Sequence, residues 1–222
     1  MRGSFFIFNR MVLLLTMLSL SLATCKSAPG APPPDSVRIY FIYGSRPAKG
    51  YEDREIKWFG GIHGGHVAME IAPNRLLSFR STEYPCHLFP HKKFSSKWEI
   101  KTVHAMWETF PPHNYNPEDL KRAVFTIPVT PAQKKTIDSL ADQYLHNSPY
   151  DYATLGMRCA SATYEILAKA GVFKPYGSTT WWKIIMPKDL RVVLLQQVRD
   201  AKGLGWGVTK YEGSRRRVWE GD

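Results

Sequence analysis

The stretch YDYATLGMRCASATYEILAKAG, residues 150–171, decides how the rest of the chain is interpreted. The apolar residues after Cys159 recur at helical spacing as far as Gly171, which predicts an amphipathic helix that begins at the cysteine. A thiol in the first turn of a helix lies near unpaired backbone N–H groups and the positive end of the helix dipole. Such surroundings favour the thiolate and lower the cysteine pKa, so we expect Cys159 to be a nucleophile. The alternative is a small apolar residue that packs the start of the helix.

The N-terminal end has the pattern of a signal peptide, residues 1–25. Two arginines precede an apolar run at 11–22, which is shorter than a membrane-spanning helix. The sequence Leu-Ala-Thr-Cys that ends at Cys25 resembles a bacterial lipoprotein cleavage box. We therefore expect an exported protein, in the periplasm or at the cell surface, that is anchored to the membrane by a lipid on Cys25. Release after an ordinary signal peptide is the alternative. Residues 26–36 are rich in proline and predict an extended linker.

The composition predicts one folded domain at 37–222, because the chain is 44% hydrophobic and shows no internal repeat. The formal net charge of +11 suits an anionic partner, or a generally basic surface. No nucleic-acid-binding motif is present, and we expect a monomer. Three cysteines are too few for a disulfide scaffold, although Cys86 and Cys159 could pair in an oxidising compartment.

Strand patterns come first along the domain and helical patterns follow, which predicts a single α+β domain with an antiparallel sheet packed against helices. A hairpin is expected where the strand opened by His66 turns at Pro73-Asn74. Thr130 begins a helix with a capping-box pattern. The expected strands are 37–43, 66–71, 75–80, 97–107 and 121–128, and the expected helices start near 131, 159 and 187.

Cys159 and His66 together supply what a thiol hydrolase requires, namely a nucleophile that loses its proton and a base that takes it. The two glycines before His66 would let the backbone or a substrate approach the imidazole closely. Zinc is the rival interpretation. His63, His66, Cys86, His87 and His91 are enough ligands by number, but their spacing matches no familiar zinc motif. We expect no metal and no cofactor.

The chain resembles circularly permuted members of the NlpC-type papain-like superfamily, in which the histidine strand precedes the cysteine helix. That superfamily includes bacterial cell-wall peptidases and lecithin:retinol acyltransferase-like enzymes. The resemblance spans roughly residues 37–200 and rests on short segments: His66–Ile71, Leu76–Phe79, Tyr150, Cys159–Ser161 and Pro187–Leu190. It implies a papain-like fold, with Cys159 as nucleophile and His66 as general base. Tyr150 stands where relatives carry a tyrosine that contacts the substrate, and a packing role is the alternative. The backbone N–H of Cys159 would help to hold the oxyanion.

The chain departs from that family at two positions. The polar residue that orients the histidine is usually histidine, asparagine or glutamine, whereas the matching position here is Ser78. Arg158 stands where many permuted relatives carry asparagine, and it could stabilise the thiolate, bind an anionic substrate or face solvent. The resemblance and the compartment suggest hydrolysis of an amide bond in peptidoglycan peptides. The alternatives are an acyl-lipid hydrolase or transferase of the same fold, and a non-catalytic lipoprotein that binds cell wall or lipid.

Overall fold

The computed structural model describes residues 35–44, 65–83, 85–91, 95–108, 120–175 and 183–213. The chain divides into two units, Met1–Pro33 and Pro34–Asp222, and all of the described residues belong to the second. The expected signal peptide, Cys25 and the linker up to residue 34 lie outside the described residues. Within the described ranges, no helix has the length and apolar character needed to cross a membrane.

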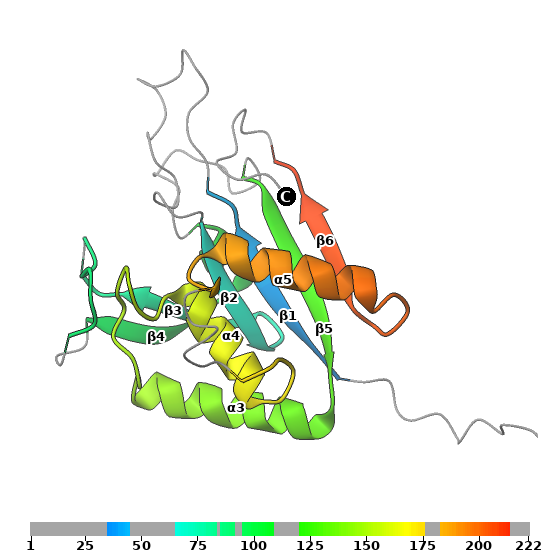
Figure 1. Cartoon of the computed structure of the whole chain (residues 1–222), viewed down its shortest axis with the longest axis horizontal. Helices are drawn as coiled ribbons and strands as arrows, with labels where there is room; N and C mark the ends of the chain where they lie inside the picture. The colour runs from blue at the N-terminus through cyan, green and yellow to red at the C-terminus, as the bar shows by residue number, and fades with distance from the viewer. Residues whose placement is uncertain are drawn as a thin grey trace, which may run out of the picture. The chain divides into compact units, whose positions relative to one another are not determined.

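A six-stranded antiparallel sheet forms the centre of the domain (Figure 1). Its strand order is β4-β3-β2-β1-β5-β6, so that β2 lies between β3 and β1. The strands are β1 (Asp35–Ile42), β2 (His66–Ala72), β3 (Arg75–Ser81), β4 (Ser96–Lys101), β5 (Arg122–Val129) and β6 (Gly207–Tyr211). The predicted α+β class and the antiparallel sheet are confirmed.

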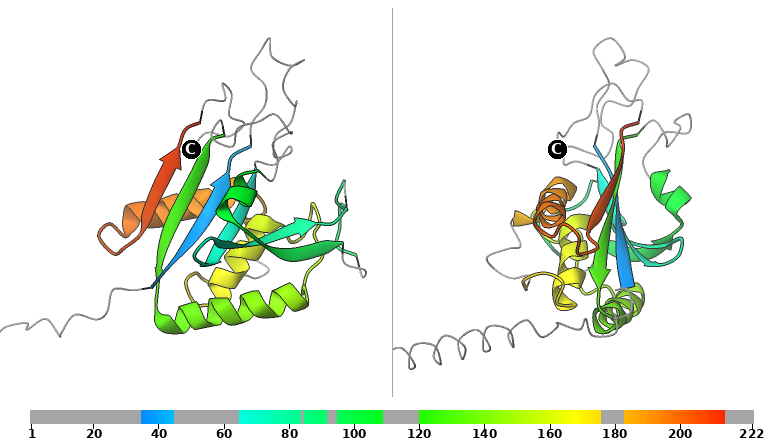
Figure 2. Two further views of the ribbon diagram at one scale, coloured as in Figure 1. Left: turned by 180° about the vertical axis from the view of Figure 1, so that it is seen from behind. Right: turned by 90° about the vertical axis from the view of Figure 1, so that its right-hand side faces the viewer.

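Helices cover both faces of the sheet, and Figure 2 shows α2 on the opposite side from α4 and α5. The helices are α2 (Val103–Trp107), α3 (Pro131–His146), α4 (Cys159–Lys169) and α5 (Pro187–Asp200). Residues of α3, α4 and α5 pack into the larger of two core clusters, and residues of α2 pack into the smaller one.

Strand β2 contributes to both cores because successive side chains of a strand point to opposite faces. Val67 and Met69 belong to the larger cluster with the residues of α4. Ala68 belongs to the smaller cluster with Met106 and Trp107 of α2. The same alternation directs His66 toward the α2 face of the sheet.

Two local predictions are confirmed. Helix α3 has the expected capping box, because Thr130 Oγ1 accepts a hydrogen bond from the backbone N–H of Gln133, and the Gln133 side chain accepts one from Thr130 N–H. The hairpin also turns as expected, with Asn74 at φ 57° between β2 and β3.

The single strand predicted at 97–107 is wrong. Strand β4 ends at Lys101, and Thr102 caps the short helix α2 by accepting a hydrogen bond from the N–H of Ala105 at 3.0 Å. Met106 and Trp107 are neighbours that are both buried, which a helix allows and a strand covered on one face does not. The edge strand β6 was not predicted.

Candidate active site

Cys159 is the first residue of α4, as predicted, and its side chain is buried, with 3% of the residue exposed. Arg158 precedes it with extended backbone at φ −135° and ψ 177°. Ser161 closes the start of the helix, because its hydroxyl accepts the Arg158 backbone N–H at 2.7 Å and donates to the Arg158 carbonyl at 3.1 Å. The Arg158 side chain is therefore not used to cap the helix.

Burial decides the state of the Cys159 thiol. It raises the pKa of Cys159 above the usual value, even though the Arg158 charge and hydrogen bonds from the N–H groups of Val67 and Ala160 act in the opposite direction. The expectation that the helix start leaves Cys159 with a lowered pKa is therefore wrong for this structure. The local N–H groups are in place, but the loss of solvent around the sulfur outweighs them.

The sulfur of Cys159 meets β2 at the residue that follows His66. The register between β2 and β3 ends at the pair Ala68–Ser78, and the thiol accepts a hydrogen bond from the backbone N–H of Val67, just beyond that end. Gly65 fixes the approach to this point with φ 88°, and a Cβ there would lie 1.8 Å from the carbonyl oxygen of Ile42. The predicted close approach therefore occurs at Gly65, and the group that approaches it is the backbone of Ile42 in β1.

His66 and Ser78 are brought together as predicted. His66 Nε2 lies 2.8 Å from Ser78 Oγ, and both residues are buried. Burial, followed by the positive charge of Lys101, lowers the pKa of His66 from its usual 6.5 to about 3, although Glu99 acts in the opposite direction. The imidazole is therefore neutral at physiological pH.

Glu99 is the charged group that sequence reasoning did not connect with His66. It pairs with Ser78 across β3 and β4, and its carboxylate binds Arg80 at 2.8 Å, Lys97 at 2.9 Å and Lys101 at 3.3 Å. Burial alone would raise the pKa of Glu99, but these cations lower it to about 2. Only the strand register reveals this neighbour, since nothing in the local sequence links positions 78 and 99.

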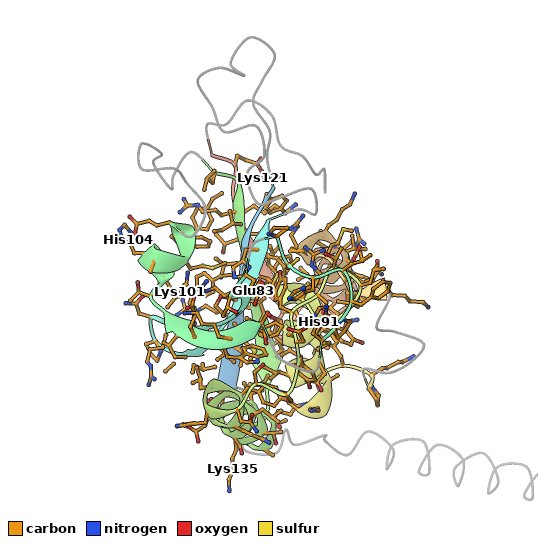
Figure 3. The ribbon with its side chains drawn as sticks, turned by 90° about the vertical axis from the view of Figure 1, so that its left-hand side faces the viewer. Glu83, His91, Lys101, His104, Lys121 and Lys135 are labelled. Atoms are coloured by element: carbon orange, nitrogen blue, oxygen red, sulfur yellow. The ribbon has the colours of Figure 1, made fainter. Side chains whose placement is uncertain are left out.

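The thiol and the imidazole approach β2 from different sides. Strand alternation places Val67 on the face covered by α4, whereas His66 and Ser78 lie on the α2 face. Figure 3, viewed from the β4 edge, shows His104 of α2 on one side of the sheet and His91 on the side of α4. The two candidate residues meet the same strand at adjacent positions along the chain.

Tyr152 is a second neighbour that sequence reasoning missed. Its hydroxyl forms hydrogen bonds with the Cys159 thiol and the Arg158 guanidinium, and its ring lies 5.4 Å from that of Phe79. Burial raises the pKa of Tyr152, so the hydroxyl keeps its proton at neutral pH. In the sequence, Tyr152 differs from Tyr150 only by standing two residues closer to Cys159. That position does not show which of the two tyrosines contacts the thiol.

Tyr150, for which substrate contact and packing were the two predicted roles, uses its hydroxyl within the protein. It donates a short hydrogen bond to Glu165 Oε1 and lies 3.2 Å from the hydroxyl of Tyr144, while Lys169 Nζ lies 2.7 Å from Glu165 Oε1. This network joins α3 to α4. The contacts support a packing role for Tyr150.

Cys86, His87 and His91 lie in the loop between β3 and β4. Cys86 Sγ lies 3.4 Å from Thr154 Oγ1, and the rings of His87 and His91 stack with centroids 3.8 Å apart. Cys86 and Cys159 are both free thiols. No group of three or more metal-binding side chains occurs within the described ranges, and His63 lies outside them.

Two hollows on the described part of the surface lie away from the thiol. One, of about 340 Å³, lies along β1, β5 and β6, and the other, of about 330 Å³, lies beside α5. Neither is lined by Cys159, His66 or Ser78.

Comparison with known proteins gives no relative for this chain: no family model, no curated protein and no solved structure matches it.

Proposed function

We propose that the protein is a cysteine-dependent hydrolase with a permuted papain-like fold, which cleaves an amide bond in peptidoglycan peptides. One observation carries the proposal. The thiol of Cys159, at the start of α4, accepts a hydrogen bond from the backbone N–H of Val67, and the preceding residue, His66, is bonded to Ser78 through its ring. The resemblance of the sequence segments around these residues to permuted NlpC-type enzymes supports the same assignment. The proposed enzyme is an exported monomer, tethered to the membrane by a lipid on Cys25.

The proposed reaction has two halves that share one base. In this proposal His66 accepts the thiol proton. Its Nε2 is bonded to Ser78 on the α2 face, so the ring has to turn toward the sulfur before the transfer. The sulfur attacks the amide carbonyl, and His66 returns the proton to the leaving amine, which gives a thioester. Water then attacks the thioester, with His66 taking its proton, and the thiol is restored.

In this proposal the resting thiol and the resting imidazole are both neutral. The raised pKa of Cys159 and the lowered pKa of His66 both disfavour the ion pair. The proton would therefore move as the sulfur attacks. The backbone N–H of Cys159, in the first turn of α4, is the proposed donor to the oxyanion.

An acyl-lipid substrate is the second candidate, and it is favoured by an exposed apolar surface. Leu88, Phe89 and Leu155 are exposed on two loops that are joined by a hydrogen bond from Leu155 N–H to the Leu88 carbonyl at 2.8 Å. The second loop leads directly into Arg158 and Cys159. An acyl chain could pack on these side chains while its carbonyl reached the thiol.

The test compares wild-type protein with Cys159→Ala and with the matched control Cys86→Ala, on purified peptidoglycan and on phospholipid vesicles. We expect new amino groups to appear from peptidoglycan with the wild type and Cys86→Ala, and none with Cys159→Ala. Release of fatty acid alone would favour the acyl-lipid candidate. Retained activity in Cys159→Ala, or no activity of the wild type on either substrate, would exclude the proposed mechanism.

A further inference from the structure

The guanidinium of Arg158 lies beside the candidate nucleophile with unused hydrogen-bond donors. Its Nε and Nη1 are buried, and neither has a hydrogen-bond partner in the described part of the chain. The guanidinium does form a hydrogen bond with the hydroxyl of Tyr152, and that hydroxyl also bonds to the Cys159 thiol. Buried polar groups are usually satisfied, and a buried donor without an acceptor is costly, most of all when it carries charge.

The charge of Arg158 is also unbalanced by its described neighbours. Burial acts to lower the pKa of Arg158, but the phenol of Tyr152 and the thiol of Cys159 outweigh it and raise that pKa, so the group stays cationic. These neighbours, together with the more weakly acting Cys86, are a phenol and two thiols and not carboxylates. The pKa values of Tyr152 and Cys159 are both raised, so these two groups keep their protons at neutral pH.

The two acidic residues nearest to Arg158 along the chain, Asp151 and Glu165, are both occupied, since Glu165 binds Tyr150 and Lys169. Asp151 is buried, and its two carboxylate oxygens accept hydrogen bonds from the backbone N–H groups of His91 and Ser95, each at 2.7 Å. It therefore holds the loop that leads from β3 to β4. Within the described ranges, no carboxylate is among the groups that act on Arg158, and a ligand could supply one.

We propose that Arg158 binds a carboxylate of the substrate, next to the carbonyl that Cys159 attacks. The proposal rests on the proposed hydrolase function and narrows its substrate class to peptide-like amides with a negative charge beside the scissile bond. The guanidinium and a carboxylate are both planar and form short, charge-assisted hydrogen bonds, which suits a buried site better than a lysine would. Because the Tyr152 hydroxyl bonds to both the Arg158 guanidinium and the Cys159 thiol, a carboxylate bound to Arg158 would lie close to the attacked carbonyl.

Two small alkylating reagents test the charge preference on the full-length protein. Iodoacetate carries a carboxylate and iodoacetamide is neutral, and both transfer a two-carbon group to a thiolate with loss of iodide. We expect the ratio of the iodoacetate rate to the iodoacetamide rate to be about tenfold higher at Cys159 than at Cys86, which serves as the internal control. Mass spectrometry of the labelled peptides gives both rates.

Substitutions of Arg158 separate ligand binding from activation of the thiol. In Arg158→Gln the ratio at Cys159 should fall to that of Cys86, whereas in Arg158→Lys, which keeps the charge, part of the preference should remain. If a substitution of Arg158 changes both alkylation rates of Cys159 by the same factor, the ratio stays constant and the change reports only the effect of Arg158 on the thiolate. If Arg158→Gln does not fold, as judged by circular dichroism, Arg158→Lys must still lower the ratio for the proposal to stand.

A protection experiment identifies the kind of anion. A tripeptide with a free carboxylate should slow the alkylation of Cys159 by iodoacetamide, and the same peptide with a carboxamide should not. Three results would overturn the proposal. The first is protection by phosphatidylglycerol vesicles alone, and the second is an equal ratio of iodoacetate to iodoacetamide rates at Cys159 and Cys86. The third is no labelling of Cys159 by either reagent. If the preference is absent but Cys159→Ala still abolishes hydrolysis, this inference fails and the proposed hydrolase survives.

Discussion

Replacing His66 by glutamine should change how the stability of the protein depends on pH. His66 is 3% exposed and bonds to Ser78, and its pKa in the folded protein is about 3 against about 6.5 in an unfolded chain. Glutamine can keep a hydrogen bond to Ser78 but takes up no proton. Comparison of the two proteins therefore isolates the titration of this one ring.

The size of the effect follows from the two pKa values. Above pH 6.5 the ring is neutral in both states, so it adds no pH dependence. As the pH falls from 6.5 toward 3, the unfolded chain binds a proton that the folded protein does not, and the wild-type free energy of unfolding falls by about 1.4 kcal/mol per pH unit. Between pH 7 and pH 4.5 the wild type should thus lose about 2–3 kcal/mol more than His66→Gln.

Urea unfolding followed by tryptophan fluorescence at several pH values measures this difference. His146→Gln removes an exposed histidine near the end of α3 and is the matched control for the loss of one imidazole. Parallel pH curves for the wild type and His66→Gln would refute the argument, because His66 would then titrate at the same pH when folded and unfolded. The neutral thiol–imidazole pair of the proposed mechanism would lose its physical basis with it.

Two further substitutions test the supports of the candidate site. Asp151→Asn should destabilise the protein by about 2–3 kcal/mol in urea unfolding, since a buried carboxylate that accepts two backbone N–H groups becomes an amide that opposes one of them; a loss under 0.5 kcal/mol would show that the loop does not depend on it. Gly65→Ala should cost at least about 3 kcal/mol, because its Cβ would clash with the carbonyl of Ile42 at a positive φ. Thermal unfolding of Gly65→Ala at the wild-type temperature would contradict the backbone geometry described before His66.

Elements with strong local signals could be predicted from the sequence. Helix α3 begins at a capping box written into four consecutive residues, 130–133, and the hairpin of β2 and β3 turns at Pro73-Asn74. The stretch 97–107 gives a weaker signal, because β4 and α2 are separated by the single residue Thr102 and the alternating pattern continues across it. Strand β6 is stabilised by its pairing with β5, and the glycine-rich sequence of this segment does not indicate that pairing.

The candidate site was predictable where a residue acts through its own position in the chain. Cys159 begins a helix, and His66 and Ser78 come together, because one hairpin fixes their spacing. Tyr152 and Glu99 were not predictable. Each reaches the site through packing or strand register with residues far away in the sequence.

The sequence by itself determined the secondary structure around the thiol, including the N–H groups at the start of α4 and the adjacent cation of Arg158. Only the tertiary structure decided the protonation of the site. The helix terminus is a local property, but desolvation depends on how the sheet and α4 close around a group. That burial raises the pKa of Cys159, lowers the pKa of His66 and leaves two donor atoms of Arg158 without an acceptor among the described residues.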